Sequence, residues 1–198
     1  MSKNKHKHKH MVRHGREDQE APAAAMPPPA GSGTGDPSSA VDEAPIGDIR
    51  GVLIQVAGAR LLLPNATIAE VLSYAEPEPV SPAPDWLLGR TRWRGWQLPL
   101  VAFSRLAGLG VDQPGLGSKV AVLKALAGNS RTPFFAVVTQ GFPRLVTVAR
   151  DSLSTLGEDG DVLPTGVQAR VRLNEDDALI PDLEALEGLV ADAVAQAA

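Results

Sequence analysis

The most informative segment of the chain reads Val52-Leu53-Ile54-Gln55-Val56-Ala57-Gly58-Ala59-Arg60-Leu61-Leu62-Leu63. Two short runs of Val, Ile and Leu lie on either side of a turn that contains Gly58. β-Branched and other large apolar residues favour strands, and a glycine between two such runs favours a tight turn. The segment therefore predicts a β-hairpin.

The same pattern continues from this segment toward the C-terminus. Short apolar runs alternate with Gly, Pro, Asn or Asp at close intervals, which is typical of an all-β sandwich or barrel. Two further hairpins are predicted around Arg94-Gly95 and around Gly128-Asn129-Ser130. The strands expected from these patterns lie at 90–93, 96–98, 120–126, 134–138, 145–148, 167–173 and 178–180.

Helical patterns are few. The clearest begins at Asp182, after Pro181, and carries an apolar stripe that we expect to pack on the protein's own sheet. Shorter helical turns are predicted at 65–68, 85–88 and 103–106. A loop is predicted for the glycine-rich stretch from Gly108 to Gly117. The stripe of the long helix consists of Leu183, Leu186, Leu189, Val190 and Val194.

The chain is predicted to consist of a tail, residues 1–47, and one domain, residues 48–198. The tail is rich in Pro, Gly and Ala and has almost no large apolar side chains, so it cannot bury enough surface to offset the entropy of ordering and should be disordered. Its alternating Lys-His repeat, from Lys5 to His10, is interpreted as an expression tag or a weak metal chelator, and not as an active site.

Charge and cysteine content narrow the functional classes. Residues 48–198 carry 13 basic and 17 acidic side chains, so the domain holds the whole net charge of −4 and lacks the basic character typical of nucleic-acid binding. The chain has no cysteine, which excludes disulfides and thiolate sites. No apolar run is long enough to span a bilayer. We expect a soluble cytoplasmic protein without membrane insertion.

Residues 48–198 contain neither His nor Cys. The four histidines, His6, His8, His10 and His14, all lie in the tail. This excludes a Ser-His-Asp or Cys-His arrangement and an ordinary zinc site in the domain. A carboxylate-based enzyme is the least favoured class, because the acidic clusters at 158–161 and 175–177 have the composition of turns. We predict no catalytic residue, no metal, no cofactor and no small-molecule substrate.

One segment carries an unusual combination of side chains: Gly89-Arg90-Thr91-Arg92-Trp93-Arg94-Gly95-Trp96. Arginines interleaved with tryptophans could bind single-stranded nucleic acid by stacking and phosphate contact. They are equally typical of a protein interface. The simplest interpretation is a hairpin whose tryptophans fill the core and whose arginines are solvated. The composition of this segment leaves all three open.

Several short motifs occur in a fixed order along the chain. Their order and spacing resemble those of the CheW-like domain family over about residues 50–190. Each motif alone is weak, so the resemblance rests on their spacing. In the first half the motifs are Gly58, Leu63-Pro64, Ile68-Ala69-Glu70-Val71, Pro79-Val80, Pro82-Ala83-Pro84, Leu88-Gly89, Arg94-Gly95 and Leu98-Pro99-Leu100-Val101. In the second half they are the stretch 135–156 and the stretch from Gly166 through Asp182-Leu183-Glu184-Ala185-Leu186.

The resemblance implies a fold of two small five-stranded SH3-like β-subdomains on a shared core. It also implies a non-enzymatic adaptor that joins methyl-accepting chemoreceptors to a CheA-type histidine kinase. The family's interaction positions correspond to Ile68, Glu70 and Val71, expected on the first exposed turn, and to Arg94, with Arg92 and Gly95 beside it. An apolar pair next to a carboxylate and a guanidinium makes a small patch with a directional rim.

Two departures mark the chain as a divergent member. Arg90-Thr91-Arg92-Trp93 stands where the family has an apolar, Asn-containing strand, and Ala102-Phe103-Ser104 replaces the family's Asp-Leu-Arg. These differences favour a specialised adaptor, such as the ChpC type of pilus-linked chemosensory systems that control type IV pili. The alternative is a small β-barrel that binds single-stranded nucleic acid through the Arg/Trp hairpin.

Overall fold

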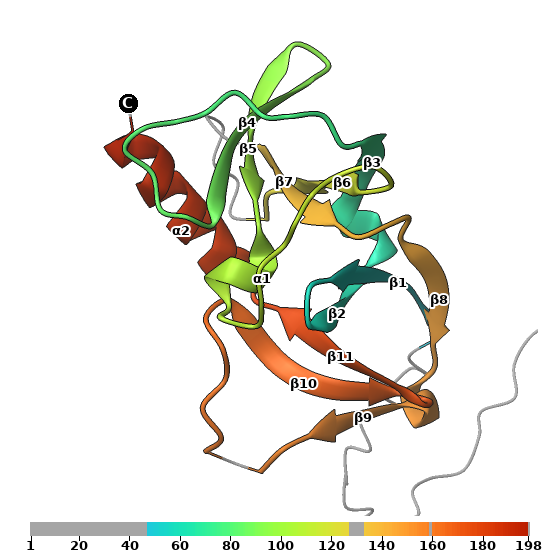
Figure 1. Ribbon diagram of the computed structural model, residues 1–198. Coiled ribbons are helices and arrows are strands. Elements are labelled where there is room, and N and C mark those ends of the chain that lie inside the picture. Colours follow the sequence, from blue (N-terminus) through green and yellow to red (C-terminus); the bar gives the residue numbers. More distant parts are fainter. Residues whose placement is uncertain (1–46, 127–132, 159, 198) are drawn as a thin grey trace, which may run out of the picture. The chain divides into compact units, whose positions relative to one another are not determined.

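The computed structural model describes residues 47–126, 133–158 and 160–197 (Figure 1). These residues form two β-sheets, short helical turns and one longer C-terminal helix, which confirms the predicted all-β class. The tail at 1–46 and the predicted turn at Gly128-Asn129-Ser130 lie outside the described residues. The predictions of a disordered tail and of a tag therefore stay predictions.

The first sheet has six strands in the order β8-β1-β2-β11-β10-β9. Neighbouring strands are antiparallel except β2 and β11, which are parallel. The predicted first hairpin is confirmed: Leu53 pairs with Leu62, and the turn contains Gly58 at a φ of 78°. The strands are β1 (Ile49–Val56), β2 (Ala59–Pro64), β8 (Arg144–Val148), β9 (Leu153–Leu156), β10 (Val167–Leu173) and β11 (Asp176–Pro181).

The second sheet has five strands in the order β3-β6-β7-β5-β4. The resemblance implies five strands in each subdomain, so the first sheet has one strand more than expected. Both remaining hairpin pairings are confirmed, since β4 pairs with β5 and β6 with β7, while β5 and β7 are parallel. The strands are β3 (Ile68–Ser73), β4 (Leu87–Trp93), β5 (Trp96–Val101), β6 (Lys119–Lys124) and β7 (Phe134–Thr139).

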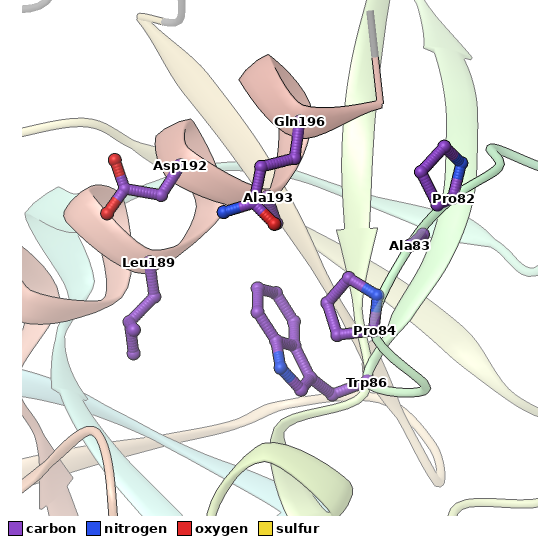
Figure 2. A pocket seen from close by; sticks show the side chains of 8 residues that line it. All are labelled: Pro82, Ala83, Pro84, Trp86, Leu189, Asp192, Ala193 and Gln196. Carbon is purple, nitrogen blue, oxygen red and sulfur yellow. The ribbon is translucent and has the colours of Figure 1, made fainter.

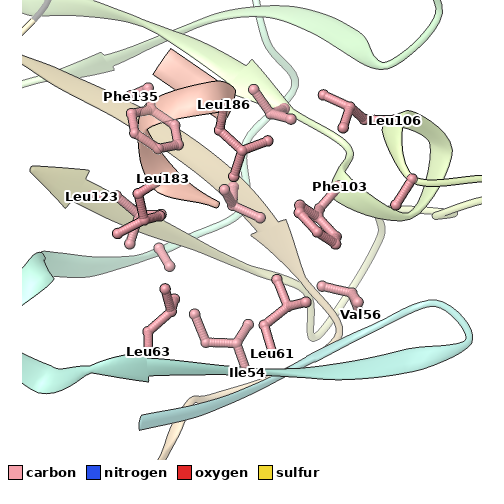
Figure 3. Packing of buried hydrophobic residues seen from close by; sticks show 14 of the residues in the cluster. Ile54, Val56, Leu61, Leu63, Phe103, Leu106, Leu123, Phe135, Leu183 and Leu186 are labelled. Atoms are coloured by element: carbon pink, nitrogen blue, oxygen red, sulfur yellow. The ribbon is translucent and has the colours of Figure 1, made fainter. Parts of the chain in front are cut away.

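The two sheets share one core and each has a second cluster of its own. Side chains alternate between the faces of a strand, and on β1 the even positions Val52, Ile54 and Val56 enter the shared cluster while Leu53 enters the cluster of the first sheet. Figure 3 shows the shared cluster, in which Leu61 and Leu63 of the first sheet meet Leu123 and Phe135 of the second. Trp93, Leu98, Leu100, Val120, Val122 and Val138 fill the cluster of the second sheet.

Helices complete the shared core. α2 (Leu183–Gln196) begins after Asp182, whose carboxylate accepts a hydrogen bond of 2.9 Å from the amide of Ala185, as a helix N-cap does. Leu186 and Val190 of its predicted stripe are buried in the shared cluster, which confirms that the stripe packs on the protein's own sheets. The short turns are η1 (Asn65–Thr67), α1 (Phe103–Leu106) and η2 (Arg150–Ser152).

The helical turn predicted at 85–88 is wrong. The chain makes a tight turn in which the amide of Leu87 bonds the carbonyl of Pro84, and β4 begins at Leu87 itself. Leu87 pairs with Val101 of β5, and the amide of Ala102 donates to the carbonyl of Trp86. Pairing with β5 therefore satisfies the backbone groups that a helix would have used.

The predicted loop from Gly108 to Gly117 is present and is fastened to the first hairpin. Asp112 is 3% exposed, and its carboxylate accepts hydrogen bonds from the amide of Ala57 at 3.1 Å and from the hydroxyl of Ser104 at 3.3 Å. A Cβ at Gly58 would lie 2.6 Å from the carbonyl oxygen of Leu109, so this close approach requires glycine. The loop thus connects the second sheet to the turn between β1 and β2.

Substitution of Phe103 tests how much the shared core contributes to the free energy of unfolding. It is completely buried there, so Phe103→Ala should lower the free energy of unfolding in urea by about 3–5 kcal/mol. The matched control is Leu145→Ala, because Leu145 is largely exposed and its truncation should change stability by less than about 0.5 kcal/mol. Equal effects of the two substitutions would contradict the shared core.

Candidate functional site

The structure places the predicted contact residues on one sheet. Ile68, Glu70 and Val71 lie in β3 and are half-buried, so the prediction of an exposed turn at this position is wrong. The 3₁₀ turn η1 ends at Thr67, and β3 then pairs with β6, with a register shift between Ile68 and Glu70. This pairing, which joins segments about fifty residues apart, draws the motif into the sheet.

The other three predicted residues lie at the far side of the same sheet. Arg92 is in β4, and Arg94 and Gly95 form the turn between β4 and β5. Both turn residues have positive φ, 47° for Arg94 and 83° for Gly95, a conformation typical of tight hairpin turns. The turn therefore presents the Arg94 side chain to solvent, where 70% of it is exposed.

Glu70 connects β3 to β4, the two opposite edges of the sheet. Its Oε2 accepts hydrogen bonds from the indole Nε1 of Trp93 at 2.8 Å and from Nε of Arg94 at 3.1 Å. Nη2 of Arg94 lies 2.9 Å from the same oxygen. The structure thus brings together Glu70 and Arg94, which are 24 residues apart, and shows that Trp93 belongs to the same contact.

These contacts change the acidity of Glu70. The hydrogen bond from Trp93 is the main cause that holds the pKa of the Glu70 carboxyl below its ordinary value; desolvation opposes it, and the charge and hydrogen bond of Arg94 add to the lowering. A carboxyl with a lowered pKa stabilises the fold above its unfolded pKa and loses that contribution as the pH falls through its folded pKa. Glu70 is therefore a charged link at neutral pH.

Aromatic contacts fix the position of the hairpin. Trp93 is buried and meets Phe134 of β7 edge to face, with ring centroids 4.8 Å apart. The guanidinium carbon of Arg94 lies 5.2 Å from the centroid of the Trp93 ring, within the range of a cation–π contact. Trp96 is 44% exposed. The interpretation that both tryptophans fill the core thus holds for Trp93 and not for Trp96.

Glu78 is a member of the site that the sequence reasoning missed. Its Oε1 accepts from Nε of Arg92 at 3.0 Å and from Nη2 at 2.6 Å, and its Oε2 accepts from Nε2 of Gln97 at 3.1 Å. Its backbone exchanges two hydrogen bonds of 2.8 Å with Arg90. A signal was present in Gly89, where a Cβ would lie 2.3 Å from the carbonyl oxygen of Glu78, because glycine within a strand often marks such an approach.

The arrangement has the character of a contact surface. Its carboxylates are held by guanidinium and indole donors of the same sheet, and the exposed groups are Arg92, Arg94 and Trp96. Within the described residues, no group of three or more His, Cys, Asp or Glu side chains could hold a metal ion. None of the helices in the described ranges is long and apolar enough to cross a membrane.

The indole bond to Glu70 can be tested by an NMR titration of the Glu70 carboxyl. Trp93→Phe removes the donor and keeps an aromatic ring, so the pKa of Glu70 should rise toward the ordinary value of about 4.3. Trp96→Phe is the control, because the Trp96 indole makes no hydrogen bond to Glu70, and it should leave that pKa unchanged. The assignment fails if the two variants shift the pKa equally.

Comparison with solved structures supports the fold. The scaffolding protein TtCheW from Thermoanaerobacter tengcongensis superposes with a TM-score of 0.60 at 14% sequence identity. The match covers 71% of this chain and 92% of that protein. At this level of identity the likeness concerns the fold alone. No curated protein matches the sequence.

Comparison with family models gives the family. The model of the CheW-like domain matches residues 50–189, which is most of the chain and nearly all of the described domain. The members of this family are scaffold proteins without enzymatic activity, and the match supports a chemosensory adaptor or scaffold role. With the order of its motifs, its two-sheet fold and this match in agreement, the chain belongs to the CheW-like domain family.

Proposed function

We propose that residues 48–198 act as a non-enzymatic cytoplasmic adaptor that couples methyl-accepting chemoreceptors to a CheA-type histidine kinase. The contact surface of the adaptor consists of Ile68, Glu70, Val71, Arg92, Arg94 and Gly95. The observation that carries the proposal is the Glu70–Arg94 ion pair, which joins the edge strand β3 to the β4–β5 turn and leaves most of the Arg94 side chain exposed. Family membership supplies the kind of partner.

The ion pair is suited to partner binding because Glu70 holds the Arg94 guanidinium in place but uses only some of its N–H donors. A guanidinium has five N–H donors, and Arg94 directs Nε and Nη2 at Glu70. The remaining donors are available to a partner carboxylate or carbonyl, in an orientation already set by Glu70. The exposed indole of Trp96 lies beside it on the same hairpin, and Trp and Arg are typical anchors of protein interfaces.

The same geometry disfavours the nucleic-acid alternative. Arg92 and Arg94 face Glu78 and Glu70, so much of their charge is compensated within the protein. Trp93 is buried against Phe134 and cannot stack on a base, which leaves Trp96 as the one exposed indole of the hairpin. Binding of single strands needs both uncompensated cations and open aromatic faces. A contact with another protein needs neither of these features, so the internal ion pairs and the buried Trp93 do not oppose it.

The two departures from the family pattern bear differently on partner choice. Ala102, Phe103 and Ser104 are fully buried, and Ser104 bonds Asp112, so this departure concerns the core. The run 90–93 lies in β4 and includes Arg92, an exposed member of the proposed contact surface. We take the second departure as support for a specialised adaptor that serves a pilus-linked chemosensory system and its type IV pilus motility.

A charge reversal tests the proposal. Arg94→Glu places two carboxylates together and removes the exposed donors, so it should weaken binding to the kinase's regulatory domain or to a receptor cytoplasmic fragment about tenfold or more. Both partners are taken from the same genome, and the dissociation constants are measured by calorimetry.

Arg172→Glu is the matched control. Arg172 forms an exposed ion pair with Asp177 on the first sheet, with Nε of Arg172 2.6 Å from Oδ1 of Asp177, and lies outside the proposed surface. This variant should keep the affinity within about twofold of the parent chain. The proposal is wrong if neither partner binds the parent chain, or if both reversals weaken binding equally.

A further inference from the structure

A pocket of about 380 Å³ lies between α2 and the segment that precedes β4. Figure 2 shows the Trp86 indole between Leu189 of the helix and Pro84, with Gln196 above it. Pro82, Ala83 and Ala193 complete the apolar wall, and Asp192 stands at the rim. A pocket of this size is at the lower end of the range for small-ligand sites, so it suits one or two side chains.

The wall opposite the helix is held in place by the backbone. The carbonyl of Trp86 accepts a hydrogen bond of 2.8 Å from Ala102, and that of Pro84 accepts one of 3.0 Å from Leu87. Trp86 and Leu189 also pack against the shared core. The pocket is therefore formed in advance, and an occupant would pay little for ordering it.

Two independent observations give the pocket a negative character. Asp192 is exposed, no cation lines the pocket, and no described residue pairs with this carboxylate. The last turn of α2, which contains Gln196, carries no basic side chain. The carbonyl groups at a helix C-terminus carry partial negative charge that a cation stabilises, and here the helix has none of its own.

We propose that this pocket binds an arginine side chain, together with its apolar neighbour, from a basic segment of a partner protein. The guanidinium stacks on the Trp86 indole and pairs with Asp192 near the C-terminal end of α2. The apolar neighbour packs on Leu189 and Pro84. Arginine fits better than lysine because its planar head stacks on an aromatic ring while its edge donates to a carboxylate.

The test uses the full chain and the dipeptide acetyl-Leu-Arg-amide, followed by NMR. The chain has three tryptophans, so its spectrum contains three indole N–H signals, and Trp86→Phe assigns the one that matters. The peptide should shift the Trp86 signal in a saturable manner and leave those of Trp93 and Trp96 in place. Acetyl-Leu-citrulline-amide, which has the same shape without the charge, should bind at least about fivefold more weakly.

Two variants separate the ion pair from nonspecific attraction to an acidic domain. Asp192→Asn should weaken binding of the arginine peptide by about two- to fivefold. Glu184→Gln, on the exposed face of the same helix and outside the pocket, should leave it unchanged. The proposal is overturned if the Trp86 signal does not shift saturably, if citrulline binds as well as arginine, or if the two variants behave alike. No kinase or receptor is present, so the result is independent of the proposed adaptor function.

Discussion

The structure depends on the burial of one set of apolar side chains between two sheets. β1 and β2 send alternate residues into the shared cluster and into the cluster of their own sheet, so their apolar runs are covered on both faces. β6 and β7 do the same in the second sheet, with Leu123 and Val137 in the shared cluster and Val122 and Ala136 in the other. Neither sheet could bury its inner face without the other, which explains why the chain folds as one domain with two halves. α2 closes the open side with Leu183, Leu186 and Val190.

The proposed contact surface follows from how the second sheet closes over its own cluster. β3 and β4 are its edges, and exposed edges invite unwanted pairing with other chains. Here Glu70 joins the edges through Trp93 and Arg94, and Glu78 covers the outer side of β4 through its backbone and through Arg92. The charged groups that protect the edges are the same groups that face solvent. A surface built in this way is ordered before any partner arrives, which lowers the entropic cost of binding.

Features set by neighbouring residues, such as turns and helix ends, can be predicted from the sequence. Strand pairings and side-chain contacts between distant residues cannot. The hairpins and the helix after Asp182 were predicted correctly, because a turn glycine, a cap and a periodic apolar stripe are local signals. The helical turn at 85–88 was wrong because the pairing of Leu87 with Val101 outweighed the capping signal of Asp85. The family resemblance implies an exposed turn around Glu70, whereas the structure has a strand there because the motif pairs with β6, about fifty residues away. Glu78 was missed for the same reason, since nothing in its own neighbourhood names Arg90 or Arg92 as its partners. The family resemblance implies that Glu70 and Arg94 belong to one contact patch, but neither the resemblance nor their spacing predicts the ion pair between them.

Glu70 both links β3 to the β4–β5 hairpin and belongs to the proposed contact surface. This limits which substitutions can change partner binding without also changing stability. A substitution at Glu70, Trp93 or Arg94 opens the link between β3 and β4. At Glu70 and Arg94 it also alters the proposed contact surface, so it should affect binding and stability together. Trp96 is free of this constraint, because it is 44% exposed and its indole makes no hydrogen bond to Glu70; its ring lies 6.5 Å from that of Phe134, measured between centroids. Arg92 is intermediate, because its loss would remove the two hydrogen bonds to Oε1 of Glu78 but would leave the bond from Gln97 and the backbone bridge to Arg90 intact. Under the proposed adaptor function, partner specificity is therefore expected to vary first at Trp96 and Arg92, with Glu70 and Arg94 kept as the fixed centre of the proposed contact surface.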